Sequence, residues 1–300
     1  LATDRPVEIV VWTNEERSRF APAMLASGVW AGAYDIEAAY AKTDDEGLTF
    51  ESELERIGYK GDVPAEPTED YHAFLELHTE QGPYLESTGS DVGVVTANTG
   101  WNRGEITFTG DADHPGPTPM SLRRDPVVAM AEVIAQVRRL TARSSRDAVG
   151  TVSRIDVDPN DIRFIADAVT FTWDVRDPDP EILDDMIETV VEEAQVAAER
   201  EGVGMESREL VHQSGVEFAA GPIEAVQRAA DALGYESRRM PSMALHDARH
   251  VADVVDTAMV FAVAADGVSH NPAEYTSPED CEKAVNVLAN AVVDLATKSE

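Results

Sequence analysis

The sequence predicts a two-domain protein of the α/β class, in which a domain built on a mixed sheet flanked by helices is interrupted by an inserted α+β domain. Three observations support this. Short, continuously apolar strands alternate with helical segments in residues 1–97, as in sheets buried on both faces. Residues 98–212 instead combine strands of alternating polarity with two long amphipathic helices. The first pattern returns over residues 213–300.

The α/β domain opens with Val7–Trp12, a β-branched apolar run that we expect to form a strand buried on both faces. Polar residues 13–16 follow, and a helix-compatible stretch then ends near Gly28. The next expected elements are a helix and two strands: Thr49–Ile57, Ala73–His78 and Val92–Ala97.

The inserted domain shows a β-α-β-β-α-β order, which with alternating strands describes an antiparallel sheet backed by two helices in the ferredoxin-like manner. Its expected strands are Arg103–Thr109, Thr151–Val157, Val169–Val175 and Val203–Leu210, and its expected helices are Arg124–Arg143 and Pro180–Arg200. The α/β domain then resumes with a helix, a strand and a closing helix at Pro222–Leu233, Thr257–Val263 and Ser277–Thr297.

Charge and composition exclude several classes of function. The 300 residues include 24 basic and 57 acidic side chains, and the net charge of −33 argues against binding to nucleic acid or to an anionic membrane. No apolar run approaches the roughly 18 residues of a membrane span. The first 13 residues do not resemble a signal peptide, because Asp4 and Glu8 interrupt them. A single cysteine, Cys281, excludes an internal disulfide, so we expect a cytoplasmic protein.

The distribution of charge is itself informative. Only four basic residues are lysines and the other 20 are arginines, while the acids are spread over nearly every segment. We interpret this as a surface adapted to high salt, where screening relieves self-repulsion. The alternative is an ordinary acidic cytosolic protein.

Two glutamates directly after the first expected strand are candidates for chemistry. Catalytic groups gather beyond the carboxyl ends of strands in α/β sheets, which is where Glu15 and Glu16 lie. Adjacent side chains there point in different directions, so one could bind a metal while the other serves as a base. In so acidic a chain, the alternative is a pair of solvated surface acids.

Four histidines are further candidates. His78 ends a predicted strand before a Gly-Pro turn and His270 follows another, positions that suit a ligand or a hydrogen-bonded structural histidine. His114 lies in a proline-rich loop of the inserted domain. His246 beside Asp247 looks like an acid-oriented imidazole, although a helix N-terminus explains the aspartate equally well.

Other catalytic patterns are missing from the sequence. It contains no GxSxG elbow, and Cys281 lies in a probable helix without an obvious base. Neither a Walker A lysine motif nor a GxGxxG segment after a strand is present. Hydride transfer and phosphoryl transfer therefore have no support.

Taken together, the motifs resemble those of the dimetal amidohydrolases related to aminoacylases and carboxypeptidases. The branch that they resemble most contains N-carbamoyl-L-amino-acid hydrolases, allantoate amidohydrolases and β-ureidopropionases. The motifs follow the family order across nearly the whole chain: TNEERSRF (13–20), LELHTEQGPYLE (75–86), VGVVTA (92–97), DADHPGPTPMSLRRD (111–125), VTFTWDVRDPD (169–179), LHDARHVA (245–252) and GVSHNPAEYT (267–276).

The resemblance implies a site with two divalent metal ions. Glu16 and His270 would bind one ion, His78 would bind the other, and Glu15 would be the general base. Two cations can lower the pKa of a bound water towards 7, and a carboxylate can then accept its proton. Ligation by histidine and carboxylate suits Zn²⁺, Mn²⁺, Co²⁺ or Ni²⁺.

The resemblance also implies contacts with a small-molecule substrate, an N-carbamoyl-L-amino acid or allantoate. Gln81 and Arg176 would hold its polar groups, with the guanidinium fork of Arg176 on a carboxylate. His246 would line the pocket, and His114 would stabilise the oxyanion, in its own site or in that of a neighbouring subunit. The inserted domain would be a lid and would form a homodimer.

Several positions depart from the family pattern. The family's first metal histidine and bridging aspartate precede the glutamate pair, whereas this chain starts only 14 residues before Glu15. We therefore expect a fragment of a longer enzyme; the alternative is a non-catalytic relative that binds a ligand or partner through an incomplete site. Arg163 replaces an asparagine expected to contact substrate, which would favour a more acidic or differently sized substrate, and Arg17 replaces a glycine.

Overall fold

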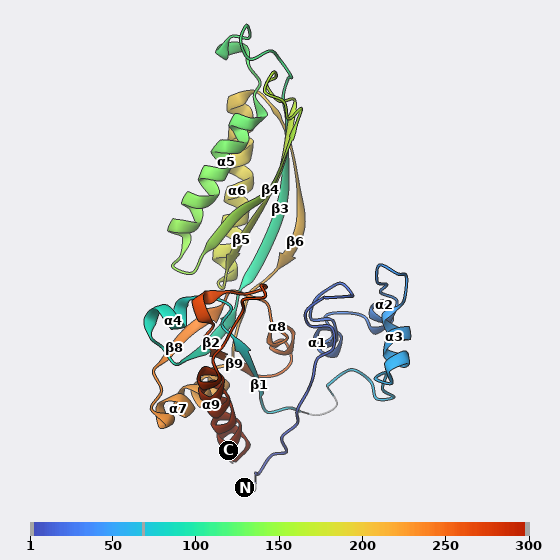
Figure 1. The fold of residues 1–300 in the computed structure, drawn as a ribbon, viewed down its shortest axis with the longest axis vertical. Helices are drawn as coiled ribbons and strands as arrows, with labels where there is room; N and C mark the ends of the chain where they lie inside the picture. The colour runs from blue at the N-terminus through green and yellow to red at the C-terminus, as the bar shows by residue number, and fades with distance from the viewer. Residues whose placement is uncertain (1–2, 68–69, 298–300) are drawn as a thin grey trace. The chain divides into compact units, whose positions relative to one another are not determined.

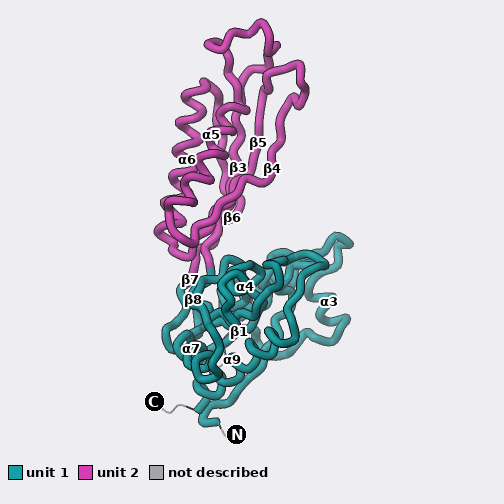
Figure 2. The backbone as a smooth tube through the Cα atoms, turned by 60° about the vertical axis from the view of Figure 1, so that its left-hand side comes forward, with its two compact units in different colours: residues 1–98, 217–300 teal, residues 99–216 magenta. Residues whose placement is uncertain are grey.

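The computed structural model describes residues 3–67 and 70–297, and the chain divides into two compact units. Unit 1 comprises residues 1–98 and 217–300, and unit 2 comprises residues 99–216 (Figure 2). Unit 1 is built on a mixed sheet and unit 2 on an antiparallel sheet. The predicted mixed α/β class is confirmed. No helix in the described ranges is both long and apolar enough to cross a membrane.

The sheet of unit 1 combines parallel and antiparallel pairs. β1 and β9 are parallel, β2 runs antiparallel to β9, and β8 runs parallel to β2. β9 is buried along its whole length, as its sequence TAMVFA suggests. The strands, in sheet order, are β1 (Phe74–Thr79), β9 (Thr257–Ala262), β2 (Val92–Asn98) and β7 (Val216–Glu217), with β8 (Ser237–Ser242) also paired to β2.

Helices of unit 1 cover this sheet. The long helices α7 and α9 pack against each other and against β9, while the short helix α8 packs on β1 and β9 (Figure 1). The helices are α1 (Leu25–Trp30), α2 (Ile36–Tyr40), α3 (Phe50–Ile57), α4 (Tyr84–Thr88), α7 (Ala220–Leu233), α8 (Ala248–Val251) and α9 (Pro278–Thr297), with a 3₁₀ turn η2 at Ala265–Gly267.

The predicted first strand, Val7–Trp12, is wrong. Within the described residues this segment is extended but pairs with no strand, and the side chains of Ile9 and Val11 are 93% and 90% exposed. Only its end is packed, where Trp12 contacts the rings of Trp30 and Phe74. A β-branched apolar run becomes a buried strand only where a neighbour supplies hydrogen bonds and cover.

One strand escaped prediction because its sequence lacks the usual signal. β8 reads SRRMPS, which contains a proline and no β-branched or aromatic residue. It pairs with β2 in parallel register, from Val92 opposite Ser237 to Asn98 opposite Ser242. A proline is tolerated at the edge of a sheet, where its missing N–H has no ladder partner to lose.

Unit 2 has the element order β-α-β-β-α-β, with all strand pairs antiparallel in the order β4-β5-β3-β6. The helices α5 and α6 pack side by side on one face of the sheet (Figures 1 and 2). The elements are β3 (Gly100–Thr109), η1 (Met120–Leu122), α5 (Pro126–Ser144), β4 (Val149–Asp158), β5 (Ala168–Asp177), α6 (Pro180–Glu201) and β6 (Gly204–Gln213).

Alternation along β3 and β5 separates the two faces of this sheet. Ile106, Phe108 and Phe171 point into the core beneath the helices, while polar side chains alternate with them on the other face. Trp173 also joins the core, and it fits because its neighbour is Gly104: a Cβ there would lie 2.5 Å from the indole ring.

Candidate active site

The loop that carries Glu15 and Glu16 is held by Asn14. The backbone of Asn14 is left-handed (φ 60°), and its side-chain amide donates to the carbonyls of Phe20 and Pro22 at 2.9 and 3.1 Å. The carbonyl of Glu15 accepts a hydrogen bond at 2.9 Å from the backbone N–H of Met24, nine residues further on. Within the TNEE segment, Asn14 therefore holds the conformation of the loop that carries the two glutamates.

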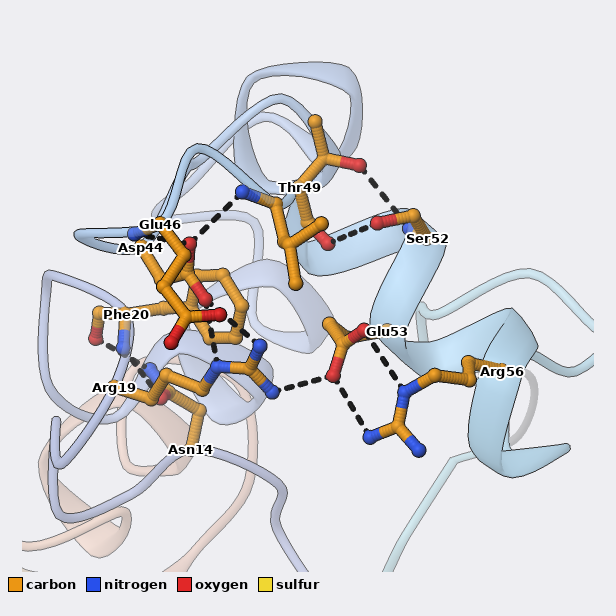
Figure 3. Close-up of polar contacts among 10 residues, drawn as sticks. Asn14, Arg19, Phe20, Asp44, Glu46, Thr49, Ser52, Glu53 and Arg56 are labelled. Carbon is orange, nitrogen blue, oxygen red and sulfur yellow. Dashed lines mark hydrogen bonds and ion pairs between the residues drawn. The ribbon is translucent and has the colours of Figure 1, made fainter.

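A second anchor ties the same loop to α3. Arg19 donates from Nε to Asp44 at 2.9 Å and pairs with Glu53, which also accepts from Arg56 (Figure 3). The two guanidinium groups, Arg56 first and Arg19 second, lower the pKa of Glu53 to about 2, so this carboxylate is ionised at any ordinary pH. The glutamate pair therefore sits on a loop fixed from two sides.

His78, at the end of β1, presents one defined ring nitrogen. Its Nδ1 lies 2.9 Å from the carbonyl oxygen of Thr79 and donates to it, so Nε2 keeps a lone pair, as in a metal-ligating or proton-accepting histidine. Its ring lies 4.5 Å, centroid to centroid, from the ring of His246. Burial first, and then His78, lower the pKa of His246 to about 3, so His246 is neutral.

The interpretation of His246 and Asp247 as an acid-oriented imidazole is wrong. Nε2 of His246 lies 2.8 Å from the hydroxyl of Ser242, whereas the carboxylate of Asp247 accepts from the hydroxyl of Ser27 in α1. Asp247 precedes α8 but caps none of its N–H groups. The hydrogen bond from Ser27, and not the neighbouring histidine, therefore orients the carboxylate of Asp247.

Two carboxyls, the half-buried Glu76 and the buried Asp247, lie beside this histidine pair. Glu76 shares the face of β1 with His78 and accepts from the backbone N–H of Ala248 at 2.7 Å. Burial, with the charge of Asp247, raises the pKa of Glu76 to about 8, and burial, with the charge of Glu15, raises that of Asp247 to about 6. Sequence reasoning missed Glu76, although a glutamate two residues before His78 in an otherwise apolar strand was a usable signal.

The carboxyl of Glu15 is under the electrostatic influence of three other predicted site residues. Burial first and then Glu16 raise the pKa of Glu15, while His78 and His270 lower it. The charges of three predicted site residues therefore act on the carboxyl of Glu15, which is a necessary condition for a shared site.

The loops that carry Gln81 and His270 meet directly. Gly267 (φ 63°) lies so close to the turn after Gln81 that a Cβ there would be 2.7 Å from the nitrogen of Pro83. Gln81 and His270 both have left-handed backbones (φ 58° and 53°), and His270 is exposed, with its N–H bonded to Glu274 at 3.0 Å. Both side chains are thus carried by tightly specified turns.

In unit 2, Arg176 belongs to a polar cluster on the open face of the sheet. Its Nε donates to Asp174 at 3.0 Å, and the same carboxylate accepts from Arg103 at 2.9 Å and from the indole of Trp101 at 2.6 Å. Both guanidinium groups also lie about 5 Å from the indole ring, Arg103 at 5.0 Å and Arg176 at 5.1 Å. Asp174 and Trp101 thus fix the orientation of Arg176.

The other two candidates of unit 2 lie on exposed loops. His114 accepts at Nδ1 from the N–H of Gly116 at 3.0 Å, which leaves its proton on Nε2. Arg163 is exposed and forms a two-point ion pair with Asp161, at 2.9 and 2.6 Å.

The similarity of this chain to known proteins extends over almost its whole length. Residues 1–294 match the sequence model of Peptidase family M20/M25/M40. The chain belongs to this family. The family resemblance seen in the sequence motifs is confirmed. The relatives named below include an N-carbamoyl-L-amino-acid amidohydrolase and an allantoate amidohydrolase, as the motifs predicted.

Two curated relatives and one solved structure illustrate the match. The N-carbamoyl-L-amino-acid amidohydrolase of Rhizobium meliloti is 40% identical over 296 residues, covering 99% of this chain and 71% of the relative. The allantoate amidohydrolase of Escherichia coli is 32% identical over 297 residues, covering 97% and 71%. A crystal structure of a hydantoinase/carbamoylase family amidase from Burkholderia multivorans superposes with a TM-score of 0.94 at 40% identity, covering 97% and 70%.

The M20 resemblance implies a metal site, and the side chains here meet that requirement only in part. The tautomer of His78 suits a ligand, because Nε2 is the unprotonated nitrogen. Across residues 3–67 and 70–297, however, no three or more His, Cys, Asp or Glu side chains are grouped so that they could hold a metal ion. Glu16, His78 and His270 do not by themselves form a complete metal site.

Proposed function

We propose that this M20 protein is a hydrolase of linear C–N bonds in small ureides or amides, with an N-carbamoyl-L-amino acid or allantoate as substrate. The observation that carries the proposal is the anchored loop of Glu15, held by Asn14 and Arg19, which presents a half-buried carboxyl with a raised pKa under the electrostatic influence of His78 and His270. Similarity to an N-carbamoyl-L-amino-acid amidohydrolase at 40% identity and to an allantoate amidohydrolase at 32% identity supports it.

Glu15 is the proposed general base. Its carboxylate is partly buried on an anchored loop, so its position is fixed while water can still reach it. Burial and Glu16 raise its pKa, and a carboxyl with a raised pKa accepts a proton more readily at neutral pH. The electrostatic influence of His78 and His270 lowers the pKa of Glu15 and so opposes this rise.

Glu16, His78 and His270 are the proposed partial ligands of divalent metal ions. When bound, such ions supply a water nucleophile at neutral pH. Because the described residues form no complete group, other donor atoms have to complete the site. Zn²⁺, Mn²⁺, Co²⁺ and Ni²⁺ all accept this mixture of imidazole and carboxylate.

The remaining candidates are proposed to bind substrate. Arg176, held by Asp174, would pair with a carboxylate, Gln81 would contact polar groups, and neutral His246 would line the pocket. His114, which carries its proton on Nε2, would donate to the oxyanion. Arg163 is proposed to favour a more acidic or differently sized substrate, and its guanidinium pairs with Asp161.

Unit 2 is proposed to be a ferredoxin-like lid through which two chains form a homodimer. Its β-α-β-β-α-β order and the sheet order β4-β5-β3-β6 support the assignment of topology. The arginine-biased acidic composition supports a cytoplasm of high salt as the working environment.

The test is hydrolysis by the full chain at high salt with Mn²⁺, Zn²⁺ or Co²⁺. Release of ammonia and free amino acid from an N-carbamoyl-L-amino acid, or of ammonia from allantoate, is the expected result. Glu15→Gln should reduce the rate at least about a hundredfold, within the range of a lost general base. Glu37→Gln, an exposed acid of α2, is the matched control. No product from either substrate would favour the non-catalytic alternative.

A further inference from the structure

The loop that carries His114 is closed at its base. Residues 111–124 leave β3 and return to α5 at one point, where the N–H of Asp111 donates to the carbonyl of Arg124 at 3.2 Å. Gly110 permits this approach, since a Cβ there would lie 2.1 Å from that carbonyl oxygen. The N–H of Ile165 also bonds to the carbonyl of Asp113 at 2.7 Å. The segment is a closed Ω-type loop with fixed ends.

Inside the loop, His114 is bonded at its ring and at its backbone. The ring accepts from Gly116 at Nδ1, and the carbonyl accepts from the hydroxyl of Thr118 at 2.8 Å. Residues 115–118 therefore form a turn that folds back on His114, and the proton on Nε2 depends on the position of Gly116.

Arg123 holds both ends of this turn. Its Nη2 donates to the carbonyl of Pro115 at 2.5 Å, and its Nε donates to the carbonyl of Thr118 at 3.2 Å. Among the described residues Arg123 makes no ion pair, although the chain carries 57 acidic side chains. Arg123 is partly buried and directs its donors to two backbone carbonyls instead of to a carboxylate. Its contacts therefore hold the backbone of the turn 115–118.

We propose that Arg123 is a positioning residue for His114. By fixing the carbonyls of Pro115 and Thr118 it keeps the N–H of Gly116 on Nδ1, and so presents Nε2–H as a rigid hydrogen-bond donor. The inference rests on the proposed function, in which His114 donates to the oxyanion. Arg123 touches neither substrate nor reacting atoms.

A merely structural role predicts different results from a positioning role. Loss of general stability would affect every site in the unit, whereas a positioning role is confined to His114. Arg200 in α6 provides the matched control, because it is an exposed arginine of the same unit that pairs with Glu132 at 2.7 Å. Arg200→Met removes the same charge and leaves the loop untouched.

The kinetic test is a double-mutant cycle with the full chain and the substrates above. Arg123→Met should lower kcat about tenfold and leave KM within about twofold, because a donor to the oxyanion acts in the transition state; a complete donor is worth about a hundredfold or more. In the background of His114→Asn, the same change should have no further effect. Arg123→Lys should restore part of kcat. Additive losses, or an equal loss in Arg200→Met, would overturn the inference.

The spectroscopic test needs no activity. With ¹⁵N-labelled histidine, the His114 resonances, assigned by their loss in His114→Asn, should report Nδ1 as a hydrogen-bond acceptor in the parent protein. In Arg123→Met they should move towards values of an unconstrained imidazole, and in Arg200→Met they should stay. Unmoved resonances in Arg123→Met would refute the positioning role. If the parent protein hydrolyses nothing, the proposed function fails, and this measurement alone decides the role of Arg123.

Discussion

Replacing Asp247 by asparagine should stabilise the protein increasingly as the pH rises. The residue Asp247 is 3% exposed, and burial together with the charge of Glu15 raises the pKa of its carboxyl from 3.8 to about 6. A group with a raised folded-state pKa contributes stability that is fully present below the unfolded pKa of 3.8 and is lost as the pH rises through 6. Asparagine removes this titration and keeps an acceptor for Ser27.

The size of the effect follows from the two pKa values. A difference of about 2 between the folded and unfolded states corresponds to about 3 kcal/mol when both are fully titrated. About 1 kcal/mol of this is already lost at pH about 4.5, because the unfolded chain has begun to ionise there. The free energy of unfolding of Asp247→Asn, relative to the parent, should therefore rise by about 2 kcal/mol between pH about 4.5 and pH about 7.5.

Urea unfolding at constant high salt, at several pH values in this window, measures the difference. Glu76, with a pKa of about 8, stays mostly protonated in this window, and because Asp247 raises that pKa, the replacement of Asp247 by asparagine changes the difference in the same direction. Glu37→Gln is the control for the loss of one negative charge, since Glu37 is exposed. Parallel pH curves for the parent and Asp247→Asn would refute the reasoning, as they would mean that Asp247 ionises as freely when folded as when unfolded.

Three further outcomes are expected. Asp174→Asn should raise KM about tenfold for substrates with a carboxylate and change kcat much less, because Arg176 loses the carboxylate that orients it. Initial-rate kinetics measure both constants, and a fall in kcat alone would contradict this role of Asp174. Gly104→Ala should destabilise the protein by about 1–3 kcal/mol in urea unfolding, because the new methyl group meets the ring of Trp173; an unchanged midpoint would contradict the packing. Lowering the salt should lower the thermal midpoint, because the net charge of −33 loses its screening, and a midpoint independent of salt would exclude a surface adapted to high salt.

The elements of unit 2 could be predicted to within a few residues because their signals are local. α6 begins at Pro180 behind the N-cap Asp179, whose side chain accepts from two N–H groups, and ends at Glu201 before the C-cap Gly202, with φ 66°. β5 alternates strictly enough that its buried face is visible in the letters VTFTWDV. Where caps and periodicity agree, the sequence is sufficient.

Unit 1 was harder to predict because its features depend on partners distant in sequence. Val7–Trp12 has the composition of a core strand and lacks a paired neighbour, whereas β8 has the composition of a loop and gains one in β2. In both cases the available hydrogen-bonding edge determined the outcome, and composition did not.

The same argument explains which site residues could be foreseen. Glu15, His78 and His270 stand in recognisable motifs, each next to the turn or strand that presents it. Ser27 could not have been found, because its importance lies in a hydrogen bond to Asp247, 220 residues away, which forms only when α1 packs on α8. Burial of that pair sets the charge state of Asp247, and Asp247 in turn acts on Glu76. The electrostatics around the proposed base are therefore a property of the packed unit, and a single motif can locate the base but not set its pKa.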